Sequence, residues 1–163
     1  MAGTLTGGLR DRMLLQAYYD AIQTYLASLG WFDAGRQHSP IAMIDQYPGD
    51  DEPPAVNTLA ISMGNMLPRR AEMGSLAYNQ QTFMYADFYA ESDALSRQVS
   101  GDILHFLQSN PVIAVRDYAA DGDPIDFYSQ VEEDTAEISR PSTATNAWQK
   151  HWAIVSWTVE DER

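Results

Sequence analysis

The sequence predicts a single α+β domain in which two amphipathic helices cover one face of a mostly antiparallel sheet. Three observations support this class: two segments carry apolar residues at helical spacing, several shorter segments have strand patterns, and the order is helix, strands, helix, strands. The 163 residues suffice for one hydrophobic core, and no repeat or linker divides them. We therefore expect one domain over residues 1–163, with its core at about 9–159.

The first predicted helix spans residues 9–29. Its apolar side chains recur every three to four residues, and Gly30 follows as a C-cap. A short strand is expected at 41–44, and the acidic, proline-rich segment 47–54 after it has the composition of a turn. Residues 56–63 then alternate between two faces, which is the pattern of a strand.

Residues 64–79 show no clean period and are predicted as a long loop excursion that reaches about residue 80. Loops of this length are usually functional or mobile. A strand is expected at 80–90, and Ser92 is a suitable N-cap for a second helix, which an Asn-Pro pair at 110–111 ends. The apolar face of this helix consists of Leu95, Val99, Ile103, Phe106 and Leu107.

The last third of the chain is predicted to be mostly extended. Strands are expected at 112–118 and 125–131, separated by an acidic turn that contains Gly and Pro. A polar loop at 140–146 precedes a strongly β-prone terminal strand at 148–159. The order of elements allows both helices to pack on the same face of the sheet.

The predicted strands carry bulky apolar side chains on both faces. In the terminal strand Trp152 and Ile154 lie on one face, whereas Val155, Trp157 and Val159 lie on the other. A sheet face that meets water normally alternates to polar residues. The surplus favours contact with further copies of the chain, and Trp152, Ile154 and Trp157 form the candidate subunit interface. The alternative is that the sheet curls, or that the long loop covers it.

The chain is strongly acidic, with 10 Lys+Arg against 23 Asp+Glu and a formal net charge of −13. Such a surface repels nucleic-acid phosphates and anionic membranes, so tight binding to either is not expected. The chain has no Cys, its start lacks the features of a secretory signal, and no apolar run is long enough to span a membrane. We therefore expect folding in the cytoplasm of the cell that makes the protein.

The sequence shows no pattern of catalytic residues. His38, His105 and His151 lack the spacing of metal ligands, and there is no nucleophile elbow, phosphate-binding loop or dinucleotide fingerprint. The acidic turns at 50–52 and 121–123 offer oxygen ligands for Ca²⁺ or Mg²⁺, although solvated turns of this composition are common. We predict no catalytic, cofactor-binding or metal-binding residue and no enzymatic activity. A small metal-dependent or acid–base enzyme is the alternative from another class.

One basic pair interrupts the acidic sequence. Arg69 and Arg70 lie in the predicted excursion, close to Met66, Leu67 and Met73. Arg and Met are enriched at protein interfaces, and Met adapts its shape to a partner. These five residues form the candidate partner interface, and an ordinary exposed loop is the alternative.

Five segments together carry a family resemblance. They are the opening helix RDRMLLQAYYDAIQTYLASLG, the strand SPIAMI with its acidic turn, the strand QQTFMYADFYAE, the helix DALSRQVSGDILHFLQ and the aromatic end WQKHWAIVSWTV. Over about residues 9–159 this pattern resembles the tail terminators, small neck proteins of long-tailed bacteriophages. The likeness is one of architecture and size, since that family has no invariant catalytic motif.

The resemblance implies a virion protein whose hexameric ring caps the tail tube, stops its polymerisation and presents a docking surface to the filled head. Its partners would be further copies of itself, the major tail tube protein and a head–tail connector or stopper protein, while DNA passes through without specific binding. An acidic lumen would let this polyanion slide. The candidate lumen residues are Asp50, Asp51, Glu52, Glu132, Glu133 and Asp134. A head–tail stopper or head-completion protein is the nearest alternative, and a host-encoded adaptor is another.

Overall fold

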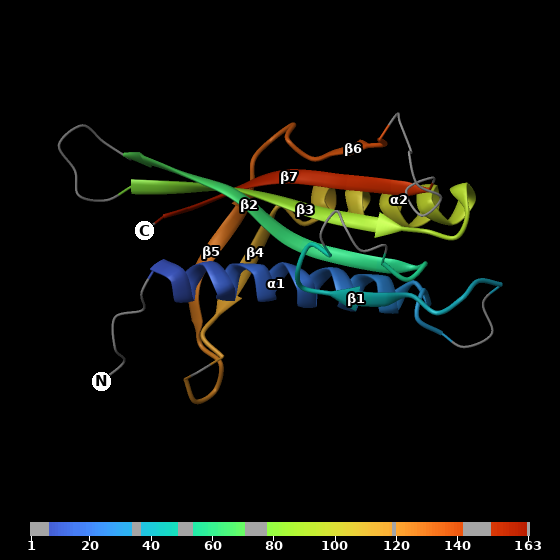
Figure 1. Cartoon of the computed structure of the whole chain (residues 1–163). Coiled ribbons are helices and arrows are strands. Elements are labelled where there is room, and N and C mark those ends of the chain that lie inside the picture. Colours follow the sequence, from blue (N-terminus) through green and yellow to red (C-terminus); the bar gives the residue numbers. More distant parts are fainter. Residues whose placement is uncertain are drawn as a thin grey trace.

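The computed structural model describes residues 7–33, 37–48, 54–70, 78–118, 120–141 and 151–162 (Figure 1). Within them two helices and a seven-stranded sheet form one α+β domain, which confirms the predicted fold class. The elements are α1 (Gly7–Ser28), β1 (Ala42–Ile44), β2 (Thr58–Arg70), β3 (Tyr78–Tyr89), α2 (Asp93–Ser109), β4 (Val112–Arg116), β5 (Ile125–Val131), β6 (Glu137–Ser139) and β7 (Trp152–Glu162).

The strands form one curled, mostly antiparallel sheet in the order β1-β2-β3-β7-β5-β4. Only β1 and β2 run parallel among the described pairs. The sheet branches at β7, because β5 pairs with it at Val159 and β6 pairs with it at Val155. In Figure 1 β4 and β5 turn away from the central strands and cross α1 near its amino-terminal half. β1 and β4 therefore end the main path of a sheet that curls around α1, and β6 forms a further edge where it pairs with β7.

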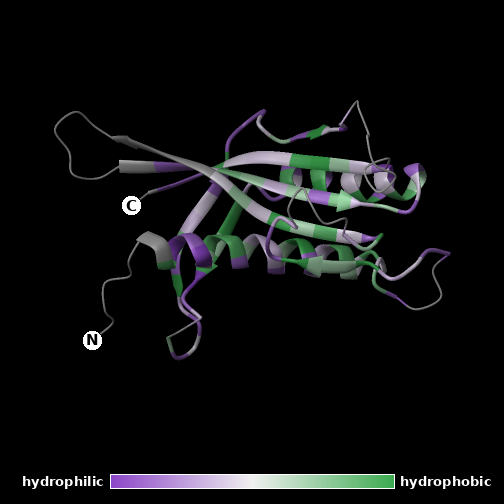
Figure 2. Ribbon diagram, in the orientation of Figure 1, coloured by the Kyte–Doolittle hydropathy of each residue, from purple (hydrophilic) through white to green (hydrophobic). Residues whose placement is uncertain are grey.

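Both helices pack on the same face of the sheet and enclose the core. Tyr18 of α1 lies against Trp157 of β7 with ring centroids 5.7 Å apart, and Tyr25 lies against Phe106 of α2 at 5.1 Å. All five residues of the predicted apolar face of α2 are buried. Figure 2 shows hydrophobic stretches on both helices, on β4 and in the middle of the central strands, with mostly hydrophilic turns. This burial is the main force that holds the layers together.

The carboxy-terminal end of α1 confirms the predicted glycine cap. Gly30 has a φ of 78°, a conformation that glycine adopts without a steric penalty. The Gly30 amide donates to the Ala27 carbonyl at 3.0 Å, and the Trp31 amide donates to the Leu26 carbonyl at 3.1 Å. These two bonds form a Schellman motif, which satisfies carbonyls at the helix end. The turn also brings Trp31 to α2, where its Nε1 donates to Asp102 Oδ2 at 2.7 Å.

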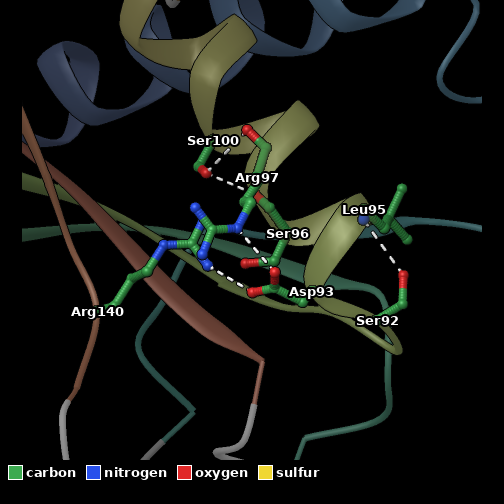
Figure 3. A network of polar contacts seen from close by, with 7 residues as sticks. All are labelled: Ser92, Asp93, Leu95, Ser96, Arg97, Ser100 and Arg140. Carbon is green, nitrogen blue, oxygen red and sulfur yellow. Dashed lines mark hydrogen bonds and ion pairs between the residues drawn. The ribbon is translucent and has the colours of Figure 1, made fainter.

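The start of α2 is fixed by a polar network (Figure 3). Ser92 is the N-cap, as predicted, and its Oγ accepts a hydrogen bond from the Leu95 amide at 3.2 Å. The Asp93 carboxylate pairs with Arg97 at 2.7 Å and with Arg140, which follows β6, at 3.0 Å. The bond from Arg97, followed by the attraction of Arg97 and Arg140, lowers the pKa of Asp93 below its usual range. Asp93 thus connects the start of α2 to the end of β6.

The prediction of a loop excursion at about 64–80 is wrong for most of these residues. β2 continues to Arg70 and β3 begins at Tyr78, so the two strands form a long hairpin. The register shifts between Met63 and Met66, which is a β-bulge. A bulge inserts a residue and breaks the two-residue alternation of faces, so the strand period disappears from the sequence at this point. Residues 71–77 lie outside the described residues.

Candidate interaction surfaces

The outer face of the β4–β5 hairpin carries exposed apolar side chains. Residues 127, 129 and 131 of β5 are buried, and the alternating phase is turned away from the helices. In that outward phase Tyr128 is 60% exposed and lies opposite Ala114, and Val112 of β4 is 53% exposed. We call Val112, Ala114 and Tyr128 the β4–β5 outer face. Because β4 is an end strand of the sheet, this face lies at a sheet edge.

A hollow of about 430 Å³ opens beside this hairpin, between α1 and the turn after β4. Leu9, Met13 and Tyr118 give it an apolar wall. The Asp20 carboxylate in its lining accepts hydrogen bonds from Gln16 Nε2 at 2.8 Å and from Tyr118 Oη at 3.2 Å. Partial burial, followed by the charge of Asp20, raises the pKa of the Tyr118 hydroxyl, so this hydroxyl remains a donor at neutral pH.

Arg12 is the one cation in the lining of this hollow. Its side chain is exposed and makes no ion pair or hydrogen bond with the described part of the chain. Arg10, one turn nearer to β5, is already engaged: it lies 3.3 Å from Asp126 and over the Phe127 ring at 5.3 Å. Arg12 shares this lining with the carboxylates of Asp20 and Asp117, so the hollow as a whole carries no positive net charge.

The structure supports only part of the candidate subunit interface that was predicted on the terminal strand β7. Trp157 is only 1% exposed and fills the core of its own subunit, so its inclusion in that interface is corrected. Trp152 and Ile154, on the opposite face of β7, are partly exposed. Trp157 is buried because both helices pack against its face of the sheet. The sheet is also curled, which was the alternative interpretation of the surplus of apolar residues.

A buried carboxyl lies on the face of the sheet opposite the helices. Asp87 of β3 is 4% exposed and accepts a hydrogen bond from Trp152 Nε1 at 3.0 Å. The Trp152 ring stacks on Tyr89 at a centroid distance of 5.3 Å. Burial raises the pKa of Asp87 to about 6, and the hydrogen bond from Trp152 opposes part of this rise. The face of the sheet opposite the helices therefore contains an acid that folding pushes toward its neutral form.

The two acidic clusters have different outcomes. Asp50, Asp51 and Glu52 lie outside the described residues. Glu132, Glu133 and Asp134 follow β5 and line a hollow of about 490 Å³ at the end of α2. Glu133 and Asp134 are exposed, and the Glu132 carboxylate accepts a hydrogen bond from Gln81 Nε2 of β3. Within the described ranges, no three His, Asp or Glu side chains are grouped as metal ligands.

The candidate partner interface lies on the long hairpin. Met66, Leu67, Arg69 and Arg70 occupy the distal part of β2, and Met73 lies outside the described residues. Figure 1 shows this end of the hairpin extending past the amino-terminal end of α1. The sequence did not predict that these residues belong to a hairpin, although the basic pair had indicated this segment as a candidate interface.

Sequence reasoning missed the β4–β5 outer face and Arg12. A signal for the first was present, because Tyr128 interrupts the polar phase that Asp126 and Gln130 set in β5. Arg12 gave no signal, since only the fold brings α1 close to the turn after β4.

Comparison with protein-family models and with curated proteins gives no match for this chain. In the described part of the chain, no helix has the length and hydropathy needed to span a membrane.

Proposed function

We propose that this chain is a ring-forming structural protein of a phage neck, and that it acts as a tail terminator. The observation that carries the proposal is the β4–β5 outer face, where Tyr128 and Val112 are more than half exposed at the edge of the sheet. Exposed apolar groups that lie together on a folded protein commonly mark a contact with another protein. The resemblance to tail terminators supplies the type of contact, namely a closed ring of identical copies.

Two further features support this function. The formal net charge of −13 is suited to a channel through which DNA passes without binding. Glu133 and Asp134 are exposed and lie on one turn, so they remain candidates for the wall of this channel together with Glu132. The β2–β3 hairpin extends past the amino-terminal end of α1, and the distal part of β2 includes Arg69 and Arg70 in its sequence, a position that suits contact with the tail tube or the head connector.

Electron microscopy of the purified protein tests the ring. We expect closed rings for the wild type and their loss in Tyr128→Lys, because a charge on the β4–β5 outer face opposes burial there. The fold of this variant should be intact, since Tyr128 is 60% exposed. Rings that persist in Tyr128→Lys would remove the observation on which the proposal rests.

A phage that lacks the gene distinguishes the neck proteins from one another. A terminator is needed to stop tail polymerisation, so its loss gives abnormally long tails. Heads that leak DNA behind tails of normal length would instead identify a head–tail stopper. Normal tails on filled, stable heads would reject both functions.

A further inference from the structure

The face of the sheet opposite the helices holds a buried carboxyl in contact with an aromatic side chain. Asp87 of β3 is 4% exposed, and its register partners on the two adjoining strands are Ala60 and Ile154. Trp152, the first residue of β7, pairs with Tyr89, two residues further along β3. The Trp152 indole NH donates to Asp87 Oδ1 at 3.0 Å, and the ring stacks on Tyr89 at a centroid distance of 5.3 Å. One indole thus contacts both the carboxyl and the neighbouring aromatic ring.

The described strands beside Asp87 bring no cation to this face. Burial removes water from a carboxylate and so disfavours its charged form. Within two register positions of Asp87, the titratable groups on the same face are Tyr85 and Tyr89 of β3 and Glu137 of β6. Glu137 lies on the far side of β7 and is itself an acid. The other side chains at these positions in β2, β6 and β7 are Thr58, Ala60, Ser62, Ser139, Trp152, Ile154 and Ser156.

We propose that Asp87 and Trp152 form a pH-sensitive cover on this face: the indole stays over the carboxyl in acid and swings away from it more often at neutral pH. A neutral acid tolerates burial, whereas a carboxylate gains hydration when the indole moves. Opening requires the loss of one hydrogen bond and one ring stack at the end of a strand, where local movements are least costly. This inference does not depend on the proposed ring.

The position of Trp152 allows it to move without the rest of the sheet. It begins β7 and is partly exposed, and in the described pairings β6 joins β7 only from Ile154 onward. Asp87, in contrast, has a paired strand on either side. Trp157 is 1% exposed and packs against Tyr18 of α1 at a centroid distance of 5.7 Å, so its movement would disrupt the core. Trp152 is therefore the part of the cover that can open.

Proton binding sets the size and the sign of the effect. Burial raises the pKa of Asp87 from the ordinary value of 3.8 to about 6, although the bond from Trp152 opposes part of this rise. The closed form therefore binds the proton more tightly than the open, hydrated form. Its advantage is present below about pH 4 and is lost as the pH rises through about 6. Between pH 5 and 7.5 the ratio of open to closed forms should rise about tenfold.

Hydrogen exchange of the indole NH groups, followed by NMR of the nitrogen-labelled protein, tests the cover. Trp152→Phe identifies the Trp152 signal. Exchange chemistry itself depends on pH, so the wild type is compared with Asp87→Asn, which keeps an acceptor and removes the charge. We expect the ratio of the two Trp152 exchange rates, wild type over variant, to rise about tenfold from pH 5 to 7.5. The Trp31 indole, which donates to Asp102 of α2 at 2.7 Å, is the internal control, and its ratio should stay within about twofold.

Low concentrations of urea separate a local movement from unfolding of the whole domain. Local opening exposes little surface, so the exchange of Trp152 should hardly respond to urea, whereas exchange through global unfolding accelerates. The buried Trp157 indole reports the global reaction.

Two results would overturn the cover. One is a Trp152 ratio that changes less than about twofold between the two pH values. The other is a Trp152 rate that rises with urea in step with Trp157, because the indole then moves only when the domain unfolds. If Asp87→Asn does not fold, the protection of Trp152 relative to free tryptophan in the wild type gives the same comparison, and it should fall about tenfold from pH 5 to 7.5.

Discussion

Replacement of Asp87 by Asn should stabilise the protein at neutral pH, and the gain should vanish in acid. Asp87 is buried on β3, and the one polar contact that the structure gives its carboxylate is the Trp152 indole NH at 3.0 Å. Asn can accept the same hydrogen bond through Oδ1, and it has nearly the same shape. The substitution therefore removes the charge while it keeps the contact.

The size of the effect follows from the pKa of Asp87. Burial raises it from the ordinary value of 3.8 to about 6. A difference of one unit corresponds to about 1.4 kcal/mol, so the full shift amounts to about 3 kcal/mol. The folded state binds this proton more tightly than the unfolded state does. The contribution of Asp87 to stability is therefore fully present below about pH 4 and is lost as the pH rises through about 6.

Urea unfolding followed by tryptophan fluorescence measures this contribution. At pH 7.5 we expect Asp87→Asn to unfold with a free energy up to about 3 kcal/mol larger than that of the wild type. At pH 4, close to the ordinary pKa of 3.8, the two proteins should differ by only about 0.5 kcal/mol. Other carboxylates titrate in both proteins, so their effect cancels in the difference. Asp121→Asn, in an exposed turn, is the matched control, and its free energy of unfolding should equal that of the wild type at both pH values.

A wild-type and variant difference that stays constant from pH 4 to 7.5 would refute this reasoning. It would mean that Asp87 has the same proton affinity in the folded and unfolded states. A variant that is less stable at pH 7.5 would show that the charged carboxylate makes a favourable contact that outweighs its burial.

Three further substitutions test the fold by equilibrium unfolding. Trp157→Ala should lower the free energy of unfolding by about 3–5 kcal/mol, because Trp157 is 1% exposed in the core. If this loss were no larger than that of Ile154→Ala, whose side chain is partly exposed, the burial argument would be contradicted. Gly64→Ala should lower the free energy of unfolding by about 1–3 kcal/mol, since a Cβ there would lie 2.6 Å from Tyr85 Cε2. The loss should be smaller in a Tyr85→Leu background, and an unchanged loss would exclude the Tyr85 ring as its cause. Ser92→Ala should cost about 1 kcal/mol through loss of the α2 N-cap, whereas Ser109→Ala at the other end should cost less; equal losses would argue against a capping effect.

The helices were predictable because their signals are local. The N-cap Ser92 and the glycine at the end of α1 act on backbone groups within a few residues, so sequence alone located them. The long β2–β3 hairpin was not predictable in this way. Its pairing depends on strand partners, and the bulge between Met63 and Met66 removes the alternation that would have indicated a strand.

The location of the exposed apolar surface could not be predicted from the sequence either. Trp152 and Trp157 have similar chemistry, yet one is partly exposed and the other is in the core. Which face of β7 meets the helices depends on register across the whole sheet, and a shift of one residue exchanges the two faces. The pattern therefore indicated a surplus of apolar groups without showing that Val112 and Tyr128 contribute to it.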